Sequence, residues 1–157
     1  MKPSVYIETS VVSYLAARPS RNATVAVFQN LTRRWWTTAP DRFRLFASEF
    51  VAREAEAGDP TAARARRKAL QGIPLLEATA EVGNLTAKLL ELRAVPPAAA
   101  NDAAHIAIAA VNQVDYLVTW NFRHIANATM RARIEDACRR AGHRPPVICS
   151  PNQLMEP

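Results

Sequence analysis

Three acidic side chains and one amide fall at positions that are expected to lie at one edge of the sheet of an α/β fold: two follow predicted strands, one begins a predicted helix and one lies within the helix after the second strand. These residues are Glu8, Glu54, Asp102 and Asn121. Three carboxylates that converge in one pocket repel one another and raise at least one pKa, unless a divalent cation neutralises them. Oxygen ligands of this kind suit Mg²⁺ or Mn²⁺, and a metal site of this type hydrolyses phosphate esters.

Each of these residues also has a structural explanation when it is taken alone. Asp102 would be favoured near a helix N-terminus by the helix dipole, and Glu54 would be a solvated helix residue. Glu8 would be a turn acid, and Asn121 would be a turn former that tolerates a left-handed backbone. The joint pattern favours a site, because four independent accidents at one predicted sheet edge are improbable.

The elements that would position these side chains alternate between short strands and helices. Apolar and β-branched runs predict strands at residues 5–7, 42–47, 75–76, 115–120 and 147–149. Helical spacing and capping residues predict a first helix that is capped by Thr9 or Ser10 and stops before Pro19, and further helices at 22–36, 48–58, 61–70, 80–93, 98–112 and 128–140. This order predicts a single domain, residues 1–157, built as a three-layer α/β/α sandwich with a mostly parallel central sheet of four or five strands. Ligands bind at the carboxyl edge of such sheets.

Composition narrows the class of protein. Hydrophobic residues make up 49% of the 157 residues, enough for one core, and the net charge of +6 suggests an anionic partner. Solvated surface arginines explain that charge equally well. The two cysteines, Cys138 and Cys149, are too few for a disulfide framework, and their spacing is unlike that of zinc ligands. The sequence has no signal-peptide pattern, and its apolar runs are far shorter than the roughly 20 residues that span a bilayer. We therefore expect a cytoplasmic protein without a membrane segment.

Four phrases, in order and across nearly the whole chain, resemble one family. They are VYIETSVVSYL, SEFVAREAEAG, NDAAHIAIAAVNQVDYLVTWNFRHI and VICSPNQLM. The chain resembles PIN-domain proteins, especially the VapC-type toxins of bacterial toxin–antitoxin pairs. The resemblance implies a PIN-like fold and a Mg²⁺- or Mn²⁺-dependent endoribonuclease. By position it implies that Glu8, Glu54, Asp102 and Asn121 are catalytic, that Glu8, Asp102 and Asn121 bind metal, and that the hydroxyls of Thr9 and Thr119 support the site.

The chain departs from the family pattern twice. Glu8 is one methylene longer than the usual Asp, and Asn121 is neutral where many relatives have Asp. A neutral fourth ligand makes a second metal ion harder to hold than the first, so the sequence leaves one or two metals open. The helix acid is also open between Glu54, which fits the family spacing better, and Glu49.

Two histidines lie near these acids in the sequence. His105 is three residues after Asp102 and therefore on the same helix face. A packed, hydrogen-bonded core histidine is the stronger interpretation of His105, with contact to the site as the alternative. A structural hydrogen bond is likewise the stronger interpretation of His124, and a phosphate contact is the alternative.

Partners are predicted from charge and apolar surface. Arg64, Arg66, Arg67 and Lys68 form one basic run, and a second basic run lies within residues 131–144. Either could be a solvated helix face, and either could bind RNA phosphates. Apolar positions such as Phe28 and Trp35 predict a homodimer, and a site this acidic would accept an arginine from an antitoxin protein.

Three functions compete at this point. The first is a metal-dependent endoribonuclease that acts as the toxin of a toxin–antitoxin pair. The second is a PIN-like fold that binds RNA or a protein partner without cleaving. The third, a phosphoacceptor receiver domain, is disfavoured because the first strand ends in a single acid and no lysine follows the last strand. The sequence does not specify the RNA target, the cleavage position or the antitoxin.

Overall fold

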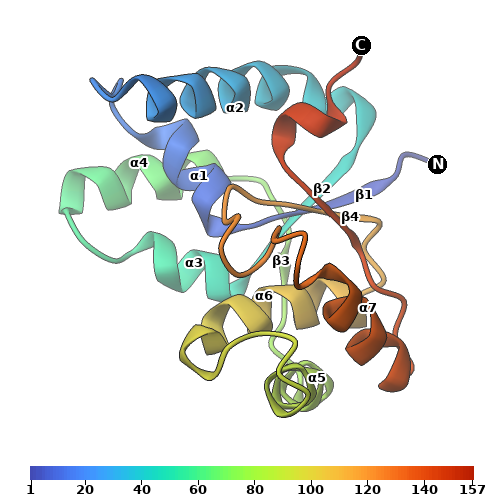
Figure 1. The fold of residues 1–157 in the computed structure, drawn as a ribbon. Coiled ribbons are helices and arrows are strands. Elements are labelled where there is room, and N and C mark those ends of the chain that lie inside the picture. The colour runs from blue at the N-terminus through green and yellow to red at the C-terminus, as the bar shows by residue number, and fades with distance from the viewer.

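A five-stranded, all-parallel sheet lies at the centre of the computed structural model, which describes every residue from Met1 to Pro157 (Figure 1). Its strands are β1 (Ser4–Ile7), β2 (Arg44–Ser48), β3 (Leu75–Leu76), β4 (Tyr116–Val118) and β5 (Val147–Cys149), in the spatial order β3-β2-β1-β4-β5. Every neighbouring pair is parallel, with Val5 opposite both Leu45 and Tyr116. The predicted fold class, with its mostly parallel sheet, is confirmed.

Seven α-helices connect and cover the strands. They are α1 (Thr9–Ala16), α2 (Ala23–Arg42), α3 (Glu49–Ala55), α4 (Pro60–Leu70), α5 (Ala80–Glu91), α6 (Ala100–Val111) and α7 (Arg131–Arg140), with short 3-10 turns at Pro97–Ala99 and Pro151–Leu154. Helix α1 contacts both α2 and α4, whereas α5 contacts both α6 and α7 on the other side of the sheet (Figure 1). This arrangement is consistent with the predicted three-layer sandwich. No helix is long and apolar enough to cross a membrane.

The core is built from the central strands and from α6. All four residues of β1 are buried, and α6 is buried from Ala103 to Ala110 except for Ala104. This burial explains the nearly continuous apolar sequence of α6, because a helix surrounded by protein has no solvated face. Trp35 is 0% exposed, so the expectation that it adds apolar surface for a homodimer is wrong.

Several helix boundaries differ from the predictions: α3 ends at Ala55, before the predicted Gly58, and α7 begins at Arg131, after the predicted residue 128. Two further differences have a clear physical reason. The N-cap of α1 is Glu8, not Thr9 or Ser10, because the Glu8 side chain folds back to accept the N–H of Ser10. Helix α2 continues to Arg42 and includes Pro40, beyond the predicted end near residue 36. Its last turns pack against the C-terminal 3-10 turn, where Arg42 donates to the carbonyl of Leu154 at 2.7 Å, so tertiary contact prolongs the helix.

The carboxyl ends of the strands meet at one edge of the sheet. Ile7 is opposite Val118, so Glu8 and Thr119 leave β1 and β4 side by side. The backbone continues this pairing for one more residue, because the N–H of Glu8 donates to the carbonyl of Val118 at 3.1 Å. Ser48 ends β2 at the same edge and caps α3 by accepting the N–H of Val51. This edge therefore collects polar side chains from three strands.

Candidate active site

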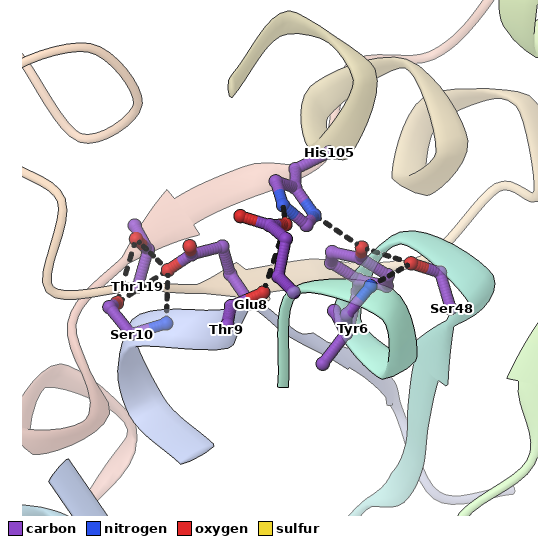
Figure 2. Close-up of polar contacts among 9 residues, drawn as sticks. Tyr6, Glu8, Thr9, Ser10, Ser48, His105 and Thr119 are labelled. Carbon is purple, nitrogen blue, oxygen red and sulfur yellow. Dashed lines mark hydrogen bonds and ion pairs between the residues drawn. The ribbon is translucent and has the colours of Figure 1, made fainter. Parts of the chain in front are cut away.

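Glu8 is buried, and its carboxylate is held by hydroxyl groups. Its Oε2 accepts hydrogen bonds from Thr119 Oγ1 at 2.7 Å, from the Ser10 N–H at 3.1 Å and from Ser10 Oγ. Figure 2 shows these two residues on one side of Glu8. The resemblance implies that Thr119 supports the site, and in the structure its hydroxyl contacts Glu8. Ser10 was expected only as a helix cap, and its contact with the acid is additional.

Glu54, on α3, is the second acid at this edge. Its Oε1 accepts hydrogen bonds from Thr9 Oγ1 at 3.1 Å and from His105 Nε2. Burial would raise the pKa of Glu54, but the hydrogen bond from His105, the charge of that imidazole when it is protonated and the Thr9 hydroxyl together lower it. Glu54 is therefore a carboxylate at neutral pH. Glu49 instead accepts the Ala78 N–H at 3.0 Å and has no contact with this group, so Glu54 is the helix acid of the site.

A buried chain of hydrogen bonds lies behind Glu54. His105 is 0% exposed, and its Nδ1 lies 2.7 Å from the Tyr6 hydroxyl, which in turn lies 2.7 Å from Ser48 Oγ (Figure 2). Burial raises the pKa of Tyr6 far above its usual value, so the phenol keeps its proton. Every group has a partner when Ser48 donates to Tyr6, Tyr6 donates to His105 Nδ1, and His105 Nε2–H donates to Glu54. His105 is thus both a packed core histidine and a contact of the site.

Asp102 lies in the first turn of α6 and contacts the loop after β4. Its Oδ2 is 3.0 Å from Nδ1 of His124, so the structural hydrogen bond predicted for His124 joins it to one of the site acids. Asn121 uses its side-chain oxygen within this loop, accepting the N–H groups of Arg123 at 3.2 Å and His124 at 3.0 Å. These contacts match the turn-forming alternative for Asn121, and its role as a metal ligand stays a prediction.

The predicted site residues lie around a closed circuit of contacts. Thr9 follows Glu8 and donates to Glu54, and Glu54 meets His105, which is one helical turn from Asp102. From Asp102 the circuit passes through His124 to Asn121, whose N–H donates to Thr119 Oγ1 at 2.9 Å, and Thr119 donates to Glu8. Hydrogen bonds therefore connect Thr119 with Glu8, Thr9 with Glu54, and Asp102 with the loop that contains Asn121, whereas the three acids make no direct contact with one another.

One oxygen of each acid makes no hydrogen bond within the protein. These oxygens are Oε1 of Glu8, Oε2 of Glu54 and Oδ1 of Asp102, whereas the partner oxygen of each carboxylate accepts at least one hydrogen bond. Carboxylate oxygens that are free of hydrogen bonds are the ligands that hard divalent cations prefer, so these oxygens fit Mg²⁺ or Mn²⁺. No three acidic, histidine or cysteine side chains form a compact metal-binding group. Mg²⁺ commonly keeps several waters and binds through one or two carboxylates.

A small cavity of about 110 Å³ adjoins Glu54. Phe50, Arg53, Glu54, Asn101 and Ala104 line it. Arg53 is exposed, and its guanidinium makes neither an ion pair nor a hydrogen bond. The cavity thus places an unpaired positive charge next to one of the site acids.

The first basic run is partly engaged in the fold. Arg66 donates to the carbonyls of Ala55 and Ala57 after α3, and Arg67 pairs with Glu56 at 2.6 Å. Arg64 and Lys68 have no ion-pair partner and line an open surface depression with Arg67 and Gln71. In the second run, Arg139 and Arg140 pair with acids one turn earlier on α7. Arg144 pairs with Asp115, which precedes β4. RNA binding by Arg64, Arg66, Arg67 and Lys68 stays a prediction.

No family model, curated protein or solved structure matches this chain. The interpretation of the site therefore depends on its geometry and on the resemblance of the four sequence phrases.

Sequence reasoning missed Tyr6, Ser10 and Ser48 as members of the site. One signal was available for Tyr6, because a hydroxyl in a buried strand requires a hydrogen-bond partner. Ser10 and Ser48 were identified as cap residues, and that role explained their presence without any contact to an acid or a phenol.

Proposed function

We propose that the chain is a metal-dependent endoribonuclease with a PIN-like fold. The observation that supports this proposal is the circuit that joins Glu8, Glu54 and Asp102 at the carboxyl edge of the sheet, each with one oxygen free of hydrogen bonds. Helix capping explains one oxygen of Glu8, and the helix dipole favours Asp102, but neither role uses the oxygens that are left free.

The side chains of the circuit orient the three acids. Ser10 and Thr119 donate hydrogen bonds to Glu8. Glu54, with its lowered pKa, is fixed by Thr9 and His105. Asp102 is oriented by His124. Glu8 and Asp102 would hold the ion, with Asn121 as the further ligand that the resemblance implies and Glu54 as a catalytic acid beside them.

A bound Mg²⁺ or Mn²⁺ supplies an activated water and stabilises negative charge on the scissile phosphate. The protein groups that would approach RNA are cationic. Arg53 borders the cavity beside Glu54, and its free guanidinium suits a phosphate oxygen. The net charge of +6 adds a general attraction for the polyanion.

The proposed biological role is that of a cytoplasmic VapC-type toxin with an antitoxin partner. An arginine of the antitoxin that reached the free carboxylate oxygens would neutralise the site and block the metal. Both cysteines are free and buried, which suits a reducing compartment. A homodimer remains part of the proposal, although Trp35 cannot contribute to its interface.

A binding function without cleavage is the second candidate. The observation that favours it is the commitment of the Asn121 side-chain oxygen to two backbone N–H groups, which removes a predicted ligand from the metal. The acids would then serve as fixed acceptors for a cationic protein segment, and RNA would bind through arginines alone.

Cleavage of RNA by the purified protein separates the two candidates. We expect Mn²⁺ to start cleavage of a labelled RNA, EDTA to stop it, and Asp102→Asn to abolish it without loss of thermal stability. Asp136→Asn is the matched control, because Asp136 is a surface acid that pairs with Arg140 and lies outside the circuit. RNA binding without metal-dependent cleavage would favour the second candidate.

A further inference from the structure

Phe122 is the only exposed aromatic side chain in the protein. It is 46% exposed, whereas the other tyrosine, tryptophan and phenylalanine residues are buried or half-buried. Its position follows Asn121 in the loop after β4, at the same edge of the sheet as the three acids. A single exposed apolar side chain is common, but this one stands beside the acidic circuit.

The ring packs against other aromatic side chains. Its centroid is 6.0 Å from that of Trp120 and 6.1 Å from that of Phe28, both edge-on. Phe28 stacks on Trp120 with centroids 4.4 Å apart, and Trp120 is anchored by its Nε1 donating to Thr32 at 2.8 Å. The exposed face of Phe122 is therefore already oriented, and a ligand that stacks on it would pay little ordering entropy.

The loop that bears Phe122 also touches two of the site acids. Three residues before Phe122, Thr119 donates to Glu8, and two residues after it, His124 contacts Asp102. Arg123 follows directly, is exposed, and has a guanidinium with no ion pair or hydrogen bond. An aromatic face and an unpaired cation thus stand together beside the acidic circuit.

We propose that Phe122 is a stacking platform for one unpaired base of single-stranded RNA, with Arg123 binding a neighbouring phosphate. This proposal rests on the proposed nuclease function and names its substrate class. Unpaired bases stack on protein aromatic rings, whereas the bases of a duplex are already stacked and the deep groove of A-form RNA excludes side chains. The cation next to the ring favours a polyanion over an apolar protein segment.

The test measures binding of a short, unstructured, fluorescent RNA by anisotropy in EDTA, so that no cleavage occurs. Phe122→Leu keeps the apolar character and removes the aromatic face, and it should weaken binding by about 5- to 150-fold, the range expected for loss of one base–aromatic stack. Phe122→Trp should retain wild-type affinity. Val147→Ala is the control, because Val147 is 56% exposed and lies at the start of β5, away from the carboxyl edge.

A walk of single abasic nucleotides along the RNA identifies the contact. One abasic position should weaken binding to the wild type and leave binding to Phe122→Leu unchanged, and a perfectly paired RNA hairpin stem should bind both proteins equally. If Phe122→Leu binds RNA as the wild type does, or if both proteins respond equally to every abasic position, the proposal is wrong and the ring is assigned to a protein contact. If the wild-type protein does not cleave RNA in Mn²⁺ but Phe122→Leu and the abasic RNAs weaken binding as expected, the nuclease proposal is wrong and the stacking proposal stands.

Discussion

Removing a single hydroxyl group tests whether the buried chain of hydrogen bonds supports the site. In Tyr6→Phe the ring keeps its place in β1, but the two hydrogen bonds of 2.7 Å to Ser48 and His105 are lost. Ser48 still accepts the N–H of Val51, whereas His105 Nδ1 loses its only partner in a position that is 0% exposed. A buried polar atom without a partner costs about 1–3 kcal/mol.

We therefore expect Tyr6→Phe to lower the free energy of unfolding by about 2 kcal/mol. For a chain of this size that corresponds to a fall in Tm of roughly 4–8 °C. Tyr116→Phe is the matched control, because it removes the same group from a half-buried tyrosine whose hydroxyl makes no hydrogen bond. Its free energy of unfolding should stay within about 0.5 kcal/mol of the wild type.

The same variant should impair the proposed activity, because His105 also donates to Glu54. Displacements near 1 Å at a reacting centre can cost about a hundredfold in rate, so we expect kcat to fall by roughly tenfold or more with KM for RNA little changed. Urea unfolding at pH 7 and steady-state cleavage in Mn²⁺ measure the two effects. Equal stabilities of Tyr6→Phe and Tyr116→Phe would refute the reasoning.

Two further predictions follow from shifted pKa values. Hydrogen bonds from Ser4 and Arg144 lower the pKa of Asp115 to about 2, so the stabilisation from its carboxylate should be complete above pH 4 and lost as the pH falls from about 4 to 2. The side chain is 35% exposed, which weakens the effect. Asp115→Asn should therefore lower the free energy of unfolding in urea by about 1 kcal/mol at pH 7 and by much less near pH 2. A constant difference across that range would contradict the assignment. Burial raises the pKa of both Cys138 and Cys149 to about 11. Both thiols should therefore react with a chromogenic disulfide only as fast as the protein unfolds. Rapid labelling of the native protein would contradict this prediction.

The sequence predicted the sheet well because each strand has a local signature. The β-branched and aromatic run at Tyr116–Val118 and the short apolar run at Val147–Cys149 indicate buried strands without any tertiary information. The two-residue strand at Leu75–Leu76 was also predicted, although two leucines alone are a much weaker signal.

Helix ends were predicted less well, because they depend on contacts from distant parts of the chain. The capping role of Ser48 was correctly predicted, because a serine directly before a helical pattern is a typical N-cap. Glu8 is a rare type of cap, and the sequence favoured the Thr9 and Ser10 hydroxyls that follow it. The end of α2 was placed before Pro40, although packing against the C-terminal residues continues the helix past it.

The acids of the site were predicted, but the groups that orient them were not. Glu8 and Asp102 were recognised at the end of a predicted strand and the start of a predicted helix, and Glu54 was chosen within its helix because it fits the spacing of the family that the sequence resembles. Tyr6 and His105 are 99 residues apart in the sequence, and only the fold shows that they meet. The role of Asn121 was open between ligand and turn former, and only its contacts with the backbone of the loop describe what it does in the protein.

Direct measurement of Mn²⁺ binding by titration calorimetry tests the central claim, that the acidic side chains at this edge bind a divalent metal ion. The account predicts saturable binding to the wild type, weaker binding to each of Glu8→Gln, Glu54→Gln and Asp102→Asn, and unchanged binding to the surface control Asp136→Asn. Wild-type protein that binds no Mn²⁺, or three variants that bind it as tightly as the wild type, would contradict the account.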